Sequence, residues 1–317
     1  MTINKNVERE YPLFYRTCLY LQKTSFFYKD IFAANEQIPI NYALAEKVCS
    51  DAFTICHSDW SEYTKKLTGL LEINIQFLKL QALLEKNGKY LYSSFKEVER
   101  EVFKKKKPGE VEGVDYIWGL YFTEIFWVTH HRLFNFFIEE FANKVLSKGT
   151  CLDAPVGSGI FLSNFLSINK DWKGIGVDLS DTAIDFAKQL FEINGQLNQI
   201  KLIKEDINKY KSGVNFDRII CAEFLEHVEN PVAVLKKIKS LLADGGKVFL
   251  TTVAWAAAID HIYLYRNADE IRSHIAQSGL IIEKELIQNI FPKDEGRLEE
   301  SNVALNYIAV LTNIPQR

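Results

Sequence analysis

The sequence predicts an α/β fold in which a doubly wound, seven-stranded, mostly parallel sheet with an antiparallel last strand follows an all-helical N-terminal domain. Apolar residues from Tyr11 to Phe103 recur at helical spacing, with almost no strand-like alternation. After Thr150, short β-branched runs alternate with amphipathic helical segments, which is typical of a parallel sheet. The last two strand-like runs have no helical segment between them and predict an antiparallel hairpin.

The composition limits the classes of protein to consider. A length of 317 residues with 47% hydrophobic residues is enough for one large or two modest domains. The net charge of −3 gives no overall field that would attract nucleic acid or an anionic membrane. The chain lacks an apolar run of about 20 residues and a secretion signal at its start, so we expect a cytoplasmic protein. Its five cysteines are scattered without a CxxC pair, which argues against a disulfide framework or a structural zinc site.

Residues 1–112 are predicted to form a helical cap or substrate domain. Its clearest apolar stripe consists of Leu67, Leu70, Leu71, Phe77, Leu78 and Leu84. Asn87 and Gly88 predict the end of this helix. We interpret the run Lys104 to Lys107 as an exposed connector rather than a phosphate-binding patch, because the charge of the chain is balanced.

Residues 113–149 are predicted to form one aromatic connecting helix. Aromatic side chains lie on nearly every side of it, so most of its faces should be covered and it could wall a ligand pocket. His130 and His131 lie in this segment. Two interpretations stay open: one histidine bonds within a crowded core while the other is exposed, or one of them, with His131 as the candidate, is a base that faces the substrate.

Residues 150–317 are predicted to form the α/β domain. Strands are expected near 150–153, 173–178, 200–206, 216–222, 246–253, 280–289 and 303–312. Three intervening helices have readable starts: Ser180 and Asn230 can cap two of them, and Asn267 with Glu270 forms a capping box for the third.

In an open parallel sheet, ligands bind at the carboxyl ends of the strands, so the residues that end each strand are the candidates for a site. The first strand ends at Asp153, followed by a turn in which Gly157 and Gly159 let a ligand approach the backbone. The second strand ends at Asp178, and the fourth strand leads to Glu223. A carboxylate at Asp178 suits the hydroxyls of a ribose.

A dinucleotide-binding dehydrogenase is the main alternative for such a turn, but the sequence argues against it. The segment from Asp153 to Gly159 lacks the GxGxxG spacing that receives a pyrophosphate. A carboxylate at Asp153 would also repel a diphosphate and instead favours a cationic ligand, such as one with an amino group or a sulfonium.

From about Thr150 to Asn313, the sequence resembles the class I S-adenosylmethionine-dependent methyltransferases. The resemblance rests on five segments in the family's order, namely 152–159 for the D-x-G-x-G-x-G turn, 176–180, 205–207, 216–223 and 241–248. One departure is Pro155, which stands where the family's first glycine is usual. The resemblance identifies residues 150–317 as an S-adenosylmethionine-binding domain.

The resemblance also implies a role for each cofactor-binding residue. Gly157 and Gly159 would lie under the methionine part of S-adenosylmethionine, with Asp153 near its amino group. Asp178 would bind the ribose, and Asp206 with Ile207 would contact the adenine. Pro155, Leu179 and Glu223 complete the predicted cofactor site.

The segment Glu223 to His227 is similar to the Glu-x-x-Glu-His segment of ubiquinone-pathway O-methyltransferases and of small-RNA 2′-O-methyltransferases. By this resemblance, Glu223, Glu226 and His227 could bind Mg²⁺, Mn²⁺ or Zn²⁺, with a further ligand from Asp260 or His261. The same sequence occurs in metal-free members, where it serves the helix start and the pocket wall. His261 and His227 are also candidates for a base or a substrate contact, with a structural role for His261 as the alternative.

The resemblance implies in-line transfer of a methyl group from S-adenosylmethionine to a small molecule. We expect O-methylation of a hydroxyl or carboxylate, in specialised metabolite biosynthesis, because the aromatic helical region suits a small, partly apolar acceptor. The alternatives are N-methylation of a small molecule, a metal-dependent RNA 2′-O-methyltransferase, and a non-catalytic scaffold with this fold. We expect neither nucleic acid nor a membrane as partner, and the helical domain could form a homodimer.

Overall fold

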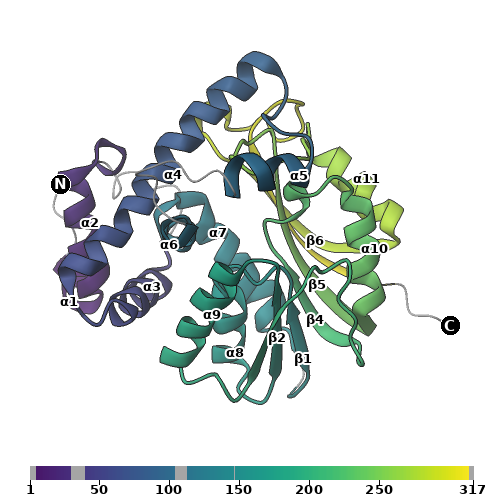
Figure 1. Ribbon diagram of the computed structural model, residues 1–317, viewed down its shortest axis with the longest axis horizontal. Helices are drawn as coiled ribbons and strands as arrows, with labels where there is room; N and C mark the ends of the chain where they lie inside the picture. Colours follow the sequence, from purple (N-terminus) through teal and green to yellow (C-terminus); the bar gives the residue numbers. More distant parts are fainter. Residues whose placement is uncertain (1–4, 30–39, 104–112, 146, 314–317) are drawn as a thin grey trace.

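The computed structural model describes residues 5–29, 40–103, 113–145 and 147–313. A twisted sheet with helices on both faces forms one side of the molecule, and the N-terminal helices lie along the other side (Figure 1). The predicted connector Lys104 to Lys107 lies outside the described residues.

The sheet has seven strands in the order β3-β2-β1-β4-β5-β7-β6. The strands are β1 (Thr150–Asp153), β2 (Lys173–Asp178), β3 (Ile200–Lys204), β4 (Phe216–Cys221), β5 (Leu242–Ala254), β6 (Leu280–Asn289) and β7 (Leu305–Asn313). Strands β1 to β5 pair in parallel, whereas β7 pairs antiparallel with both β5 and β6. The predicted doubly wound sheet with an antiparallel last strand is therefore confirmed.

Helices between the strands cover both faces of the sheet. They are α8 (Ile160–Ile168), α9 (Asp181–Ile193), the short 3₁₀ helix η5 (Leu225–His227), α10 (Pro231–Leu241) and α11 (Ala268–Ser278), with the 3₁₀ helix η6 (Pro292–Asp294) between β6 and β7. The apolar faces of α8 and α9 pack in one hydrophobic core, and those of α10 and α11 pack in a second core. The predicted caps are present, since the side chains of Ser180, Asn230 and Asn267 each accept a backbone N–H of the first turn.

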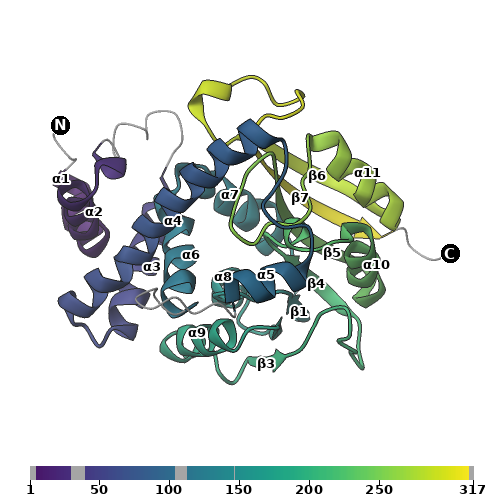
Figure 2. The same cartoon turned by 45° about the horizontal axis from the view of Figure 1, so that its top comes forward.

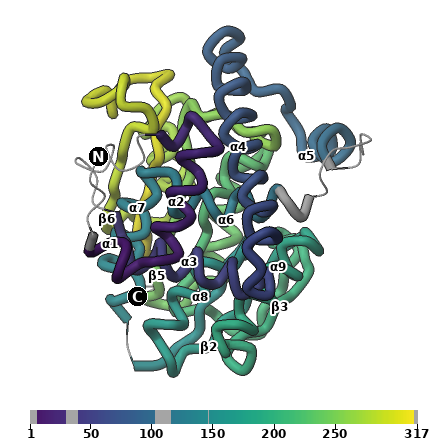
Figure 3. The backbone as a smooth tube through the Cα atoms, turned by 90° about the vertical axis from the view of Figure 1, so that its left-hand side faces the viewer, coloured from purple at the N-terminus to yellow at the C-terminus, as the bar shows by residue number. Residues whose placement is uncertain are grey.

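The N-terminal region is helical, as predicted. It consists of α1 (Lys5–Glu10), α2 (Pro12–Thr24), the 3₁₀ helix η1 (Phe26–Tyr28), α3 (Tyr42–Ile55), α4 (Trp60–Asn87), α5 (Phe95–Val98) and the π-helical segment η3 (Glu99–Phe103). The long helix α4 ends at Gly88, which has the left-handed conformation with φ 67°. Seen from this side, α4 runs past α2, α3 and α6 (Figure 3). None of the helices within the described residues is both long and apolar enough to cross a membrane.

The segment predicted as one connecting helix comprises three helical pieces instead. These are α6 (Gly113–Phe126), α7 (Val128–Phe136) and the π-helical segment η4 (Phe137–Ala142). The first break is at Trp127, which is extended, with φ −93° and ψ 114°. The indole N–H of Trp127 donates to Asn74 Oδ1 of α4 at 2.8 Å. A single helix was expected because the aromatic residues continue across the break.

Aromatic side chains join the connecting segment directly to the sheet. The ring of Phe249 in β5 lies 4.9 Å from that of Phe137, 5.6 Å from that of Phe161 and 5.7 Å from that of Phe141. The same apolar core continues into α2, α3 and α4. The helical region is thus held against the sheet by a shared core.

Helices α4 and α6 cross at a point where only glycine fits, and their close contact is visible in Figure 2. A Cβ atom on Gly119 would lie 2.5 Å from Ile73 Cδ1 and 2.7 Å from the carbonyl oxygen of Gly69. This crossing sets the position of α6 and of the segment that follows it.

We predict that Gly119→Ala lowers the free energy of unfolding by about 1–3 kcal/mol, because the methyl group would overpack the crossing. The measurement is urea denaturation followed by circular dichroism. Gly213→Ala is the matched control, because a Cβ there meets no atom within 4 Å. Equal stability of the two variants would contradict the tight crossing.

Candidate functional site

The turn after β1 is fixed to the two neighbouring strands. The N–H of Ala154 donates to the carbonyl of Ile220 at 3.0 Å, and the N–H of Val156 donates to that of Val177 at 2.9 Å. Pro155, the departure from the family pattern, follows a cis peptide bond within this turn. Gly157 has φ +49°, and a Cβ on it would meet no protein atom within 4 Å. The turn therefore leaves open space above Gly157 for a ligand.

Asp153 is a buried carboxylate at the base of this turn. Its Oδ2 atom is buried and has no hydrogen-bond partner among the described residues. Burial raises the pKa of Asp153 well above its ordinary value, although a backbone hydrogen bond from Leu162 opposes the shift. A carboxyl group in this environment becomes a stable carboxylate when a cation lies beside it.

Asp178 connects the ends of β1 and β2. Its Oδ2 accepts the N–H of Gly157 and its Oδ1 accepts that of Ser180, both at 2.9 Å. Burial raises its pKa. Each oxygen keeps a further lone pair, so Asp178 shapes the glycine turn and can still accept a hydroxyl group.

The remaining predicted cofactor contacts differ in exposure. Asp206 Oδ1 accepts both the N–H and the side-chain N–H of Asn208, so this carboxylate shapes its own turn. Ile207 is buried in the second core. Leu179 is 51% exposed and offers an open apolar surface beside Asp178.

Beyond β4, the chain carries a half-buried carboxylate, Glu223. Asp153 lies opposite Ile220 in the β1–β4 register, so Glu223 follows three residues beyond that position. Its backbone has φ +47°, which is unusual for a residue with a side chain. Its Oε1 atom is buried without a partner among the described residues. Burial raises the pKa of Glu223, and the nearby His130 partly offsets the increase.

Three predicted site residues, two from the segment after Glu223 and one from the loop after β5, lie together in space. One ligand atom each from Glu226, His227 and His261 lies within 4.8 Å of the others. Glu226 is fully buried, its Oε2 accepts the hydroxyl of Thr252 at 2.6 Å, and its Oε1 has no partner among the described residues. Burial first, and then the charge of Glu223, raise the pKa of Glu226.

Backbone carbonyls orient both imidazoles of this group. His227 Nδ1 lies 3.2 Å from the carbonyl oxygen of Asp260, and His261 Nδ1 lies 2.9 Å from that of Ala256. Because a carbonyl only accepts, each Nδ1 carries a hydrogen, and Nε2 of the neutral ring has a lone pair. Burial disfavours a charged His227, but Asp260 and Glu226 outweigh this effect and raise its pKa. Burial lowers the pKa of His261 to about 3, so this imidazole is neutral at physiological pH.

The structure reduces the predicted metal-ligand set from four residues to three. Glu223 is not part of the group formed by Glu226, His227 and His261. Asp260, the alternative further ligand, has Oδ1 3.6 Å from His227 Nδ1 and accepts the hydroxyl of Tyr116 at 3.3 Å. Asp260 therefore lies on the Nδ1 side of His227, opposite the Nε2 atom.

Helix α4 and the segment after it hold the loop that carries His261. The side chain of Gln81 donates to the carbonyl of Trp255 at 3.0 Å and accepts the N–H of Ala257 at 3.1 Å. Trp255 has φ +51°, so Gln81 clamps the loop at a strained position. Tyr90 donates its hydroxyl to the carbonyl of Ala256, and its ring packs edge-on against His261. No sequence pattern indicated a role for Gln81 or Tyr90.

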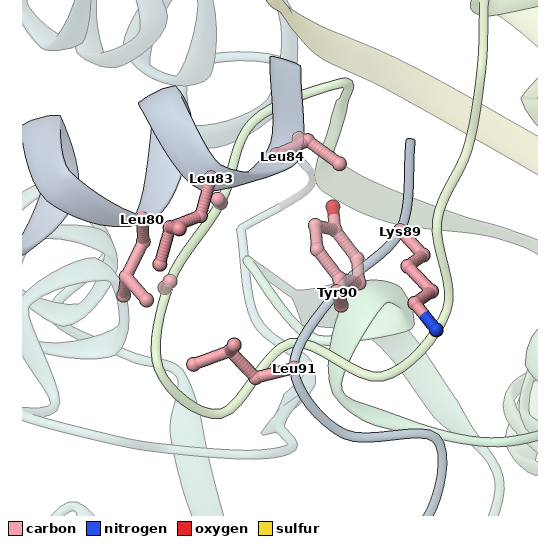
Figure 4. A pocket seen from close by; sticks show the side chains of 8 residues that line it. Leu80, Leu83, Leu84, Lys89, Tyr90 and Leu91 are labelled. Carbon is pink, nitrogen blue, oxygen red and sulfur yellow. The ribbon is translucent and has the colours of Figure 1, made fainter. Parts of the chain in front are cut away.

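A small apolar pocket adjoins this loop. Figure 4 shows the side chains of α4 and of the following segment around it. Its lining consists of Leu80, Leu83, Leu84, Lys89, Tyr90, Leu91, Ala257 and Ala258. Since Tyr90 contacts both the pocket and His261, the pocket borders the predicted site.

The two adjacent histidines of α7 have different roles. Both ring nitrogens of His131 meet backbone groups: Nε2 lies 2.9 Å from the carbonyl of Ile125, and Nδ1 accepts the N–H of Asn41 at 3.3 Å. Burial lowers its pKa to about 4. These contacts favour a structural role for His131 over a base that faces the substrate, and both histidines are buried where one was expected to be exposed. His130 instead contacts Glu124, a pairing across the α6–α7 break that sequence spacing did not reveal.

Comparison with known proteins agrees with this geometry. Residues 152–248 match a family model described as a methyltransferase domain. Ubiquinone biosynthesis O-methyltransferase of Coxiella burnetii (strain Dugway 5J108-111) is 37% identical over 83 residues, which is 25% of this chain and 33% of that protein. The enzyme of the same name from Dechloromonas aromatica (strain RCB) is 34% identical over 103 residues, which is 32% of this chain and 43% of that protein.

Among solved structures, the mitomycin 7-O-methyltransferase MmcR is similar to this chain with a TM-score of 0.52 and 11% sequence identity. The similarity covers 75% of this chain and 68% of that one, and it shows the fold alone. The chain spans 33% to 48% of the length of the curated relatives that it matches. Residues 150–313 therefore have the fold of a class I S-adenosylmethionine-dependent methyltransferase domain, as the five sequence segments predicted.

We predict that S-adenosylmethionine binds more weakly as the pH falls through the pKa of Asp153. The raised pKa favours the protonated form of Asp153 in the free protein, whereas a cationic ligand favours its carboxylate. Isothermal titration at several pH values, in buffers with different ionisation enthalpies, should show proton release on binding. Asp153→Asn should bind more weakly and lose this pH dependence. Equal affinities of the variant and the wild type would contradict a charge contact at Asp153.

Proposed function

We propose that this chain, which contains a class I methyltransferase domain, transfers the methyl group of S-adenosylmethionine to an oxygen atom of a small molecule. The observation that carries the proposal is the buried, unpartnered oxygen of Asp153 below an open glycine turn, beside a histidine and carboxylate group at the next strand end. The turn fits a cationic cofactor, and the group beyond β4 fits activation of an acceptor.

The residues at the strand ends fit the parts of S-adenosylmethionine. Asp153 would pair with its amino group, and the open space above Gly157 would take its methionine chain. Asp178, with a free lone pair on each carboxylate oxygen, would accept the ribose hydroxyls. Leu179, which is exposed beside Asp178, would cover the apolar face of the nucleoside. The protein would then mainly hold cofactor and acceptor in line.

Glu226, His227 and His261 fit a divalent metal ion. Their donor set of two imidazoles and one carboxylate suits Zn²⁺, Mn²⁺ or Mg²⁺, and Glu226 Oε1 is a buried donor atom in need of a cation. Backbone carbonyls fix both histidines with Nε2 free, which is the usual support for a metal-binding imidazole. A bound ion would lower the pKa of an acceptor hydroxyl.

We propose oxygen rather than nitrogen as the acceptor atom. The curated relatives are named as O-methyltransferases of ubiquinone biosynthesis, and MmcR is named as a 7-O-methyltransferase of mitomycin. The ring of Phe77 lies 5.2 Å from that of Trp127 and 5.6 Å from that of Phe291, and this half-buried group suits a partly aromatic molecule. Biosynthesis of a small aromatic metabolite fits these features. A cytoplasmic location and a homodimer formed through the helical region stay predictions.

We predict that the wild-type chain binds S-adenosylmethionine and releases S-adenosylhomocysteine when supplied with hydroxylated aromatic acids or phenols. Asp178→Ala should lose most cofactor affinity, because both the glycine turn and the ribose contact depend on this carboxylate. Titration calorimetry and a coupled assay for S-adenosylhomocysteine measure the two steps. Asp181→Ala is the control, because the Asp181 side chain is exposed and, within the described part of the chain, forms an ion pair with Lys204. If the wild type binds no cofactor, methyl transfer is contradicted and a non-catalytic scaffold role is left.

We predict that EDTA abolishes methyl transfer and that Mn²⁺ or Mg²⁺ restores it. Manganese binding, followed by electron paramagnetic resonance, should weaken by about 10-fold or more in His261→Gln, because one of three protein ligands is lost. His274→Gln serves as the control, since His274 bonds Tyr263 and Tyr265 outside the ligand group. Full activity in EDTA, with no metal bound, would contradict the metal proposal.

A further inference from the structure

A second histidine and carboxylate pair lies near the end of β4, and it comes from the helical region. His130 Nδ1 lies 3.1 Å from Glu124 Oε2, across the break at Trp127. The His130 side chain is 6% exposed and that of Glu124 is 14% exposed. Because a carboxylate only accepts, Nδ1 carries the hydrogen and Nε2 is left as the proton-accepting atom of His130.

The pair interacts electrostatically with Glu223. The charges of His130 and Glu223 interact strongly enough that each shifts the pKa of the other, and Glu223 also interacts with Glu124. Glu223 has the strained backbone and the unpartnered Oε1 described above. Three separate elements, α6, α7 and the end of β4, thus bring two carboxylates and one imidazole together.

This group lies at the edge of the sheet where the cofactor turn is found. Glu223 follows the strand that pairs with β1, whose end carries Asp153. An aromatic wall continues from the group: the ring of Trp127 packs edge-on against His130 at 5.4 Å and contacts Phe77 at 5.2 Å.

We propose that His130, oriented by Glu124, is the base that takes the proton from the acceptor hydroxyl, an inference that rests on the proposed methyl transfer. The acceptor oxygen attacks the sulfonium methyl and forms a carbon–oxygen bond. The sulfur–methyl bond breaks, its electron pair stays on sulfur, and S-adenosylhomocysteine is released. The hydroxyl proton goes to His130 Nε2.

Glu124 acts as a positioning residue in this step. Its bond to Nδ1 fixes the tautomer and the orientation of the ring, and its charge stabilises the imidazolium that forms. Burial disfavours a charged His130, but Glu124 and then Glu223 outweigh this effect and raise the pKa of His130. The titratable groups that face His130 are Glu124 on α6, His131 on α7 and Glu223 beyond β4.

The sign of the pH dependence follows from these contacts. A base must be neutral before it accepts a proton, so the rate should rise with pH as His130 loses its proton. Removal of the Glu124 charge lowers the pKa of His130, and the rising part of the pH–rate profile should move to lower pH. A residue that only supports the fold would lower the rate without this displacement.

Activity measurements test the roles of the two residues. With 4-hydroxybenzoate, 3,4-dihydroxybenzoate and 1-naphthol as acceptor probes, His130→Gln should lower kcat by about 10²-fold or more while cofactor affinity stays the same. Glu124→Gln should lower kcat by a smaller factor and displace the pH–rate profile to lower pH. His274→Gln, outside the site, should behave as the wild type. An unchanged kcat in His130→Gln would overturn the proposal.

A crystal structure with S-adenosylhomocysteine tests the geometry without any acceptor. The cofactor sulfur should lie within about 8 Å of His130 Nε2, which is roughly the sum of a sulfur–methyl bond, an attack distance of about 3 Å and one hydrogen bond. A longer separation, with the cofactor bound at the glycine turn, would overturn the role of His130 and leave the proposed function standing. Failure of the wild type to bind the cofactor would instead remove the proposed function.

Discussion

The burial of carboxylates at one edge of the sheet is the constraint on which the site depends. Four carboxylates lie at or just beyond the ends of three strands, and burial raises the pKa of each. They are Asp153 of β1, Asp178 of β2, and Glu223 and Glu226 beyond β4. Oxygen atoms of three of them lack partners among the described residues. Buried charges are costly unless they are paired, so an edge of this kind is suited to cationic ligands. A sulfonium cofactor and a divalent ion would meet this requirement at two neighbouring positions.

The helical region completes the site because it shares a core with the sheet. The rings around Phe249 hold the connecting segment against the sheet. The close crossing at Gly119 sets the position of α6 relative to α4. From this fixed position, Gln81 and Tyr90 hold the loop of His261, while Glu124 and His130 form a pair across the break between α6 and α7. The chemistry of the site therefore depends on side chains from both halves of the chain.

The sequence was most informative for site residues whose position depends only on a neighbouring strand or turn. The strand ends at Asp153, Asp178 and Glu223, and the short Glu226 and His227 pair, could be placed because each follows its own strand or turn. Contacts between distant segments could not be predicted: Gln81 lies 174 residues from Trp255, and Tyr90 lies 166 residues from Ala256. The contact of His131 with Asn41 could not be predicted either, since Asn41 lies 90 residues away.

The continuous run of aromatic residues also concealed a change in backbone path. The hydrogen bond from Trp127 to Asn74 accompanies the break between α6 and α7. A helical pattern of apolar residues cannot predict such a long-range hydrogen bond. The break places Glu124 and His130 together although they are six residues apart. A continuous helix would have separated them, because positions six apart do not face each other.

Transfer of a labelled methyl group tests the central claim most directly. The protein would be incubated with trideuteromethyl S-adenosylmethionine and a small-molecule extract of the cells that produce it, and products would be identified by mass spectrometry. We predict a trideuteromethyl ether or ester of a small aromatic molecule that is absent when Asp153→Asn replaces the wild type. Label found only on nucleic acid, or no labelled product from a protein that binds the cofactor, would contradict the account.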